Sequence, residues 1–180
     1  YFMTEGVVKQ VEVPGMLGQP VQQAIQSTKI YDTDFVCDRG LKNQNTEIIV
    51  DNLDSVHAGI RYCNNGKVAL LNFSSYKNPG GMFINGSKAQ EECLCHAWNN
   101  RHKNKALYLN RALYSPDILF RYGEVLFNCD VITCAAPNKS AAQKYQNVSD
   151  EENTKVLKSR IKFVLDIAKD NEVNTLILGA

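Results

Sequence analysis

The stretch KVALLNF, residues 67–73, is a continuous apolar run with the length of one β-strand. Runs without polar alternation are typical of strands that are buried on both faces, as in parallel sheets covered by helices. The same pattern returns in DVITCAA, residues 130–136, and in NTLILGA, residues 174–180. These three segments predict an α/β protein whose sheet has parallel strands at its centre.

A helix is predicted between the last two of these strands. SDEE, residues 149–152, is a capping box in which Ser149 is the N-cap and Glu152 is the N3 residue. Apolar residues then recur at helical spacing as far as Ala168. Strand, helix and strand in this order form a βαβ unit. We therefore expect a three-layer α/β/α architecture with a mixed sheet and a parallel centre.

Three further segments have readable patterns. TEIIV, residues 46–50, is short and β-branched, which predicts a strand. DNLDSVHAGIRYC, residues 51–63, reads as a helix. The apolar residues on one side of that helix are Leu53, Val56 and Ile60, with Cys63 as a further candidate. Residues 106–126 contain strand-like pieces, and Ser115 followed by Pro116 predicts a break between them.

Length and composition suit one globular domain, because the chain has 180 residues, of which 44% are hydrophobic and 22% charged. A net charge of +1 gives no electrostatic reason to expect nucleic-acid binding. No apolar run approaches the ~20 residues of a membrane-spanning helix, and no secretory signal opens the chain. We expect a cytoplasmic protein with its main domain at residues 46–180. Residues 1–45 are expected to form an N-terminal extension or a helical accessory segment.

The cysteines raise the question of a metal site. CLCH, residues 93–96, contains Cys93, Cys95 and His96, but no second ligand pair of the CxxC type accompanies it. On a helix, positions i and i+2 also point about 200° apart. A Cys/His zinc protein remains an alternative, and we expect reduced structural thiols and no metal. The six cysteines are Cys37, Cys63, Cys93, Cys95, Cys129 and Cys134.

The segment NPGGMFINGSKAQEE, residues 78–92, follows the strand at residues 67–73. Ligands of such sheets bind beyond the carboxyl ends of the parallel strands. Gly80 and Gly81 permit positive φ and a close approach of the backbone to a ligand. Backbone amides at the start of a helix also favour anions. The loop is therefore a candidate ligand-binding element, although a Pro-Gly-Gly sequence can also be a simple turn.

A helix is expected to begin within the same segment. Ser87 and Gln90 fit a capping box of the form S-x-x-Q. Glu91 and Glu92 lie in the first turn, about 100° apart around the helix axis. One of them can bind a hydroxyl while the other presents a proton. The structural alternative stays open, because acidic residues in a first turn also complement the helix dipole.

VALLNFSSYKNPGGMFINGSKAQEECLC, residues 68–95, resembles the signature region of the bacterial-type poly(ADP-ribose) glycohydrolases, a branch of the macrodomain fold. The hallmark of that family is GGG followed a few residues later by QEE. Here residues 80–82 read GGM and residues 90–92 read QEE. Three later segments are also similar to the family and occur in its order: LYLNRALYSPDILFR, CDVITCAAPN and NTLILGA. The resemblance covers roughly residues 46–180.

The resemblance implies hydrolysis of the ribose–ribose O-glycosidic bond of poly(ADP-ribose), with release of ADP-ribose. Glu92 would be the catalytic acid/base, and Glu91 would hold ribose hydroxyls beside the scissile bond. The implied substrate-binding residues are Asn72, Ser75, Gly80, Gly81, Met82, Gln90 and Asn138. No cofactor is required. The implied partners are ADP-ribose, its polymer and ADP-ribosylated proteins, without membrane or direct nucleic-acid binding.

Two features of the chain depart from the family pattern. Met82 stands where the family has its third glycine, and it would be strained if that position required positive φ. Met82 motivates one alternative function, an ADP-ribose-binding macrodomain without catalysis. Another alternative, which uses the same pocket, is hydrolysis of single ADP-ribosyl groups. The sequence also ends at Ala180, before the glycine-rich segment that wraps the diphosphate in the family. We therefore expect the C-terminal part of the fold to be missing.

Overall fold

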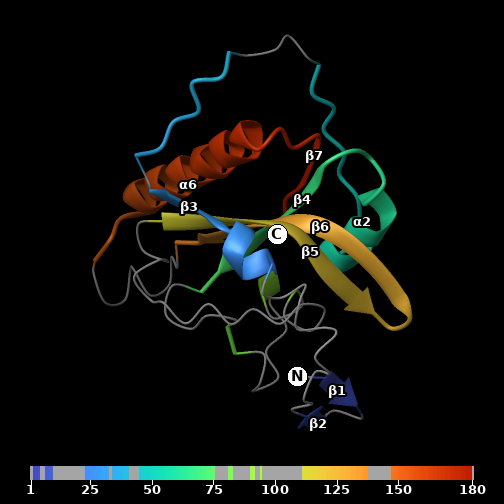
Figure 1. The fold of residues 1–180 in the computed structure, drawn as a ribbon. Coiled ribbons are helices and arrows are strands. Elements are labelled where there is room, and N and C mark those ends of the chain that lie inside the picture. The colour runs from blue at the N-terminus through green and yellow to red at the C-terminus, as the bar shows by residue number, and fades with distance from the viewer. Residues whose placement is uncertain are drawn as a thin grey trace.

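The computed structural model describes residues 2–4, 7–9, 23–32, 34–40, 45–75, 81–82, 90–91, 94, 111–137 and 147–179 (Figure 1). Its labelled elements are, in chain order, β1 (Phe2–Thr4), β2 (Val7–Lys9), β3 (Lys29–Asp32), α2 (Ser55–Tyr62), β4 (Val68–Ser74), β5 (Arg111–Tyr122), β6 (Val125–Ala135), α6 (Asp150–Asp170) and β7 (Thr175–Ile177). Residues 23–27 are also helical.

The main sheet has five strands in the order β3-β5-β6-β4-β7. β4 runs parallel to both of its neighbours, β6 and β7. β5 is antiparallel to β6 on one side and to β3 on the other. The three apolar runs are therefore adjacent strands, and the KVALLNF run lies between the other two. This arrangement confirms the mixed sheet with parallel central strands.

Side chains of β4 alternate between two buried clusters, one on each face of the sheet. Ala69 and Leu71 pack in the cluster that α6 covers. Val68 and Leu70 pack in the cluster that includes Val56 of α2. A strand that is covered on both faces has no polar face, which explains its continuous apolar sequence. Helices on both faces confirm the three-layer α/β/α architecture.

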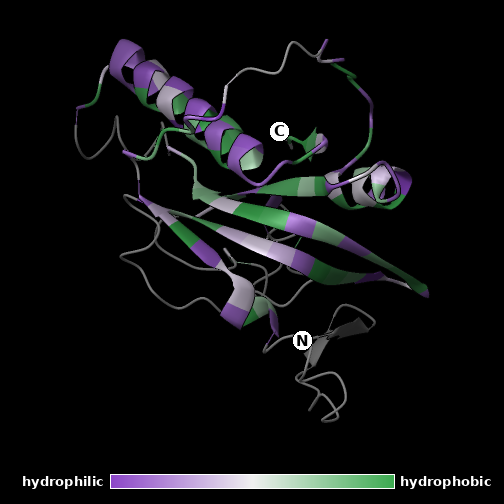
Figure 2. Cartoon of the chain, turned by 45° about the horizontal axis from the view of Figure 1, so that its top comes forward, coloured by the Kyte–Doolittle hydropathy of each residue, from purple (hydrophilic) through white to green (hydrophobic). Residues whose placement is uncertain are grey.

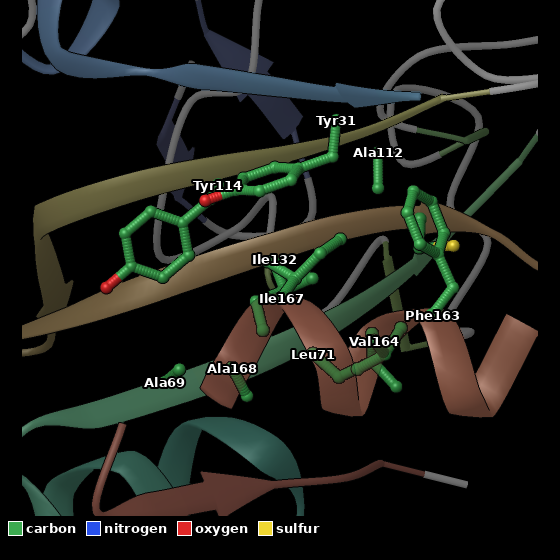
Figure 3. Packing of buried hydrophobic residues seen from close by; sticks show 11 residues of the cluster. Tyr31, Ala69, Leu71, Ala112, Tyr114, Ile132, Phe163, Val164, Ile167 and Ala168 are labelled. Atoms are coloured by element: carbon green, nitrogen blue, oxygen red, sulfur yellow. The ribbon is translucent and has the colours of Figure 1, made fainter. Parts of the chain in front are cut away.

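The helix predicted after the capping box is α6. The Ser149 hydroxyl accepts a hydrogen bond from the Glu152 N–H at 3.1 Å, as the capping box predicts. The buried hydrophobic residues of α6 point toward β4 and β6, and most of the exposed residues of the helix are hydrophilic (Figures 2 and 3). The buried residues of α6 are Phe163, Val164, Ile167 and Ala168.

The helix predicted at residues 51–63 is shorter than expected. Asp54 is its N-cap, and the Asp54 carboxylate accepts from the His57 N–H at 2.8 Å. Leu53 therefore precedes the helix and is exposed, so its assignment to the packed face is wrong. Val56 is buried as predicted, and Ile60 packs against the same cluster.

The predicted break at Ser115 is a β-bulge within one long strand. β5 continues through it, and its register with β6 shifts between Ser115 and Ile118. Asp117 has a φ of 53°, and its N–H donates to the Asp130 carboxylate at 2.8 Å. Because Pro116 has no N–H to give to the ladder, a bulge lets the strand pass this position.

The strand predicted at residues 46–50 is wrong. Residues 45–50 have no regular secondary structure, and Ile48 and Val50 are 86% and 95% exposed. β-branched residues favour a strand only where neighbouring strands bury and pair with them. The division at residue 45 remains a prediction. β3 lies before that division and pairs with β5 of the main sheet.

The packing of α6 gives a direct test of the core. Replacing Ile167, which is 0% exposed, with alanine should lower the free energy of unfolding by about 2–5 kcal/mol. Leu165 lies on the same helix and is 49% exposed, so Leu165→Ala should change the free energy of unfolding by less than about 0.5 kcal/mol. Urea titrations of the two variants measure both values. Equal destabilisation would contradict the packing of α6 described here.

Candidate active site at the carboxyl end of β4

The carboxyl ends of β4, β6 and β7 meet at one edge of the sheet because the three strands are parallel. β7 ends first: the pairing of β4 with β7 stops at Leu70 and Ile177. The pairing of β4 with β6 continues to Ser74 and Ala135. Beyond Leu70, the β7 side of β4 therefore carries backbone groups that β7 does not pair.

Gln90 binds to this unpaired side of β4. Its side-chain Nε2 donates to the Leu71 carbonyl at 2.9 Å, and its Oε1 accepts from the Phe73 N–H at 3.2 Å. Nε2 also donates to the Ser55 hydroxyl at 3.1 Å, in the first residue of α2. Gln90, expected to bind substrate, thus makes three hydrogen bonds with the protein itself.

Glu91 is the next residue, and it binds the next available N–H along β4. Its Oε2 accepts from the Ser75 N–H at 2.6 Å, and the residue is only 3% exposed. Residues 90, 91 and 94 are helical, and Leu94 is buried among the side chains on one face of the sheet. A charge-assisted bond of this length fixes the carboxylate at the end of β4.

Two buried polar side chains of β4 have no hydrogen-bond partner within the described protein. Asn72 is 1% exposed and Ser74 is 2% exposed, and neither amide atom of Asn72 nor the hydroxyl of Ser74 is bonded. Side chains two residues apart share a face, so both lie on the side of Leu70 and Leu94. An unsatisfied buried polar group costs about 1–3 kcal/mol, so such groups point to a place for a ligand or a bound water.

The sequence identified Asn72 but missed Ser74. It named the neighbouring Ser75, whose described contribution is its backbone N–H to Glu91. The alternation of buried side chains along β4 was the pattern that could have found Ser74, because it lies two residues beyond Asn72 on the same face.

Gly81 and Met82 differ in backbone conformation. Gly81 has a φ of 61°, in the left-handed region that glycine adopts without strain. Met82 is 46% exposed and is not among the described non-glycine residues with positive φ, which are Asp117, Asn147 and Glu172. The premise that Met82 is strained by a positive φ is therefore wrong.

Several predicted site residues lie outside the described part of the chain, and their roles remain predictions. They are Gly80, Glu92 and Asn138, together with Ser87 of the capping box and Cys93, Cys95 and His96 of the CLCH motif. The candidate site residues that the structure describes are Asn72, Ser74, Ser75, Gly81, Met82, Gln90 and Glu91.

The described cysteines are free thiols: Cys37, Cys63, Cys129 and Cys134. Burial raises the pKa of Cys129 to about 12, and electrostatic interactions with its neighbours Cys63 and Asp130 add to the shift. Burial also raises the pKa of Cys134, against the opposing effect of Arg160. Such thiols stay protonated near neutral pH, which suits a structural role. Among the described residues, no three His, Cys, Asp or Glu side chains are grouped to hold a metal ion.

Helices on both faces of a mixed sheet, with a buried glutamate fixed at the carboxyl end of β4, the middle one of its three parallel strands, define a macrodomain-like α/β protein. Residues 5–121 match the family model described as "Microbial-type PARG, catalytic domain". The chain belongs to this family of poly(ADP-ribose) glycohydrolase (PARG) catalytic domains. The match includes residues 5–45, which precede the predicted main domain.

Solved structures of bacterial glycohydrolases are similar to this fold. Poly(ADP-ribose) glycohydrolase from Thermomonospora curvata is 25% identical with a TM-score of 0.77, and the match covers 100% of this chain and 73% of that chain. Its complex with the inhibitor ADP-HPD has a TM-score of 0.73 at 25% identity, over 98% of this chain and 71% of that chain. The Deinococcus radiodurans enzyme in complex with ADP-ribose is 25% identical with a TM-score of 0.74, over 94% and 77% of the two chains. No curated protein matches the sequence.

No helix among the described residues is long and apolar enough to cross a membrane.

The backbone of the glycine loop gives a second test. Gly81→Ala places a side chain at a left-handed φ and should lower the free energy of unfolding by about 1–2 kcal/mol. Met82→Gly relieves no such strain, and should lower it by about 0.5–1 kcal/mol because glycine loses more backbone entropy on folding. Thermal or urea unfolding compares the two variants. Stabilisation by Met82→Gly would contradict the backbone conformation described here.

Proposed function

We propose that the chain hydrolyses the O-glycosidic bond between adjacent riboses of poly(ADP-ribose) and releases ADP-ribose. Family membership supports this reaction. The observation that carries the proposal is the buried carboxylate of Glu91, which accepts the Ser75 N–H at the carboxyl end of β4. This is the edge at which α/β sheets bind their ligands, and Glu92 follows Glu91 directly in the sequence.

The proposed mechanism needs one carboxyl group that changes its protonation state. The Glu92 carboxyl gives its proton to the departing ribose oxygen as the bond from that oxygen to the anomeric carbon breaks. The anomeric carbon passes through an oxocarbenium-like state. The Glu92 carboxylate then takes a proton from water, whose oxygen bonds to the anomeric carbon. One water is consumed, and Glu92 ends in its starting form.

Glu91 has a different role in this proposal. Its position is set by the Ser75 N–H, so it can hold ribose hydroxyls in a fixed place beside the reacting carbon. A carboxylate beside the reacting carbon also stabilises the positive charge that develops in the transition state. The two neighbouring glutamates therefore divide the work between sugar orientation and proton transfer.

The ligand that the site is proposed to take is the ADP-ribose unit of the polymer. A similar glycohydrolase from Deinococcus radiodurans was solved in complex with ADP-ribose. Asn72 and Ser74 offer buried polar atoms that no described residue binds, on the same face as Leu94. The remaining residues proposed to bind substrate are Ser75, Gly80, Gly81, Met82 and Asn138. ADP-ribosylated proteins in the cytoplasm are the proposed physiological substrates.

Two alternative functions use the same pocket, and one assay separates them. Binding of ADP-ribose without cleavage was suggested by Met82, and the backbone of Met82 does not have the positive φ that would cause strain. Hydrolysis of single ADP-ribosyl groups differs from polymer hydrolysis in the bond that breaks. A mono-ADP-ribosylated protein, offered beside the polymer, reveals which of these bonds the chain cleaves.

The proposed acid/base is tested by Glu92→Ala. Loss of the proton donor should lower the rate of ADP-ribose release from poly(ADP-ribose) by about 10²–10⁴-fold. The matched control is Glu124→Ala, because Glu124 is an exposed residue of the turn between β5 and β6, at the amino end of β6. Its rate should equal that of the unsubstituted protein. Equal rates for all three proteins would contradict the role of Glu92.

A further inference from the structure

We propose that Gln90 is a positioning residue whose side-chain amide replaces a missing residue of β7 on the edge of β4. In this position it holds Glu91 against the end of the strand. The positioning role of Gln90 rests on the function proposed above, because Glu91 acts on substrate only if that function holds. The hydrogen-bonded arrangement itself does not depend on it.

The amide of Gln90 makes the bonds that a residue of a parallel strand would make. In a parallel ladder, a residue donates its N–H to one carbonyl of the neighbouring strand and accepts from the N–H two residues further on. Gln90 donates to the Leu71 carbonyl and accepts from the Phe73 N–H, so it occupies the place opposite Asn72. A side-chain amide has the same donor and acceptor as a peptide group, which makes this substitution possible.

The bonds of Gln90 lie on the β7 side of β4. Backbone groups of successive residues alternate between the two edges of a strand. Ser74 belongs to the β6 side, because its carbonyl accepts from the Ala136 N–H at 3.3 Å. Leu71 and Phe73 therefore point to the opposite edge, where β7 ends at Ile177.

The register shows which residue of the chain Gln90 replaces. Leu70 pairs with Ile177, so a continued register would bring Gly179 opposite Asn72. A Cβ built on Gly179 would lie only 1.7 Å from Gln90 Nε2 and 2.8 Å from the Ser55 hydroxyl oxygen. The backbone after β7 thus passes directly beside the amide, and only a residue without a side chain fits there.

All donors of the Gln90 amide are used within the protein. An amide nitrogen has two hydrogens, and these go to the Leu71 carbonyl and to the Ser55 hydroxyl. Gln90 is therefore hydrogen-bonded to β4 and α2 and lies against the segment after β7. Its amide has no N–H left for a substrate. This assignment differs from the substrate-binding role that the sequence suggested for it.

The consequence for the site is a fixed register of the helix on β4. Phe73 and Ser75 present their N–H groups on the same edge, two residues apart. Gln90 takes the first of these and Glu91 takes the second. If the amide of Gln90 is displaced, its hydrogen bonds to β4 are lost. The hydrogen bond from the Ser75 N–H is then what still holds Glu91 to the end of the strand.

A double-substitution cycle tests the contact without reference to activity. Gly179→Ala should raise the unfolding equilibrium constant of the otherwise unsubstituted protein about tenfold, because the added Cβ collides with the Gln90 amide. In the Gln90→Ala background the same substitution should cost less than about threefold, because the amide that it collides with is gone. Gly40→Ala is the matched control, since a Cβ on Gly40 meets no atom within 4 Å. Additive effects of the two substitutions would overturn the inference.

Activity and binding then separate positioning from direct contact with substrate. Gln90→Ala should lower kcat for polymer cleavage by about tenfold or more, whereas a merely stabilising residue leaves kcat unchanged below the melting temperature. In a Glu91→Ala background, Gln90→Ala should leave the Kd for ADP-ribose within about twofold, because Gln90 acts through Glu91. Further weakening in that background would show direct contact and overturn the inference. Absence of cleavage by the unsubstituted protein, with the unfolding cycle intact, would overturn the proposed function alone.

Discussion

The structure of the site depends on one edge of β4, where backbone groups extend beyond the end of β7. Buried backbone N–H and C=O groups require partners, and an unpaired one costs about as much as a lost hydrogen bond. Here the Leu71 carbonyl and the Phe73 and Ser75 N–H groups are bound by two consecutive side chains, Gln90 and Glu91. The backbone groups at this edge need hydrogen-bond partners. Meeting that need places an acidic side chain at the carboxyl ends of the parallel strands, where α/β sheets bind ligands.

The sequence predicts the central elements because burial controls them directly. β4 and the second half of β6 are buried and appear as apolar runs, and α6 begins where the Ser149 capping box places it. β7 also appears as an apolar run, although it is a half-buried strand at the edge of the sheet. The strand at residues 46–50 was wrong because β-branched residues need a neighbouring strand, and none pairs with them among the described residues. The bulge after Ser115 was predicted only as a break, since its register shift depends on pairing with β6.

The site was less accessible to prediction than the fold. Spacing alone allowed Glu91 to be a helix-dipole residue, and the resemblance to a family was needed to give the two glutamates separate roles. The function of Gln90 depends on where β7 stops and on Gly179, residues far from it in the sequence, so no local pattern could reveal it. Met82 illustrates the opposite case: a change within a motif suggested strain that its backbone does not have.

Amide hydrogen exchange measures the central claim at the atoms concerned. Phe73 and Ser75 lie beyond the pairing of β4 with β7, so without Gln90 and Glu91 their N–H groups would be free to exchange. The account predicts slow exchange at both N–H groups in the unsubstituted protein, and exchange at Phe73 that is at least about tenfold faster in Gln90→Ala. Exchange at Ala69, within the paired part of β4, should stay slow in both. Fast exchange at Phe73 and Ser75 in the unsubstituted protein would contradict the account.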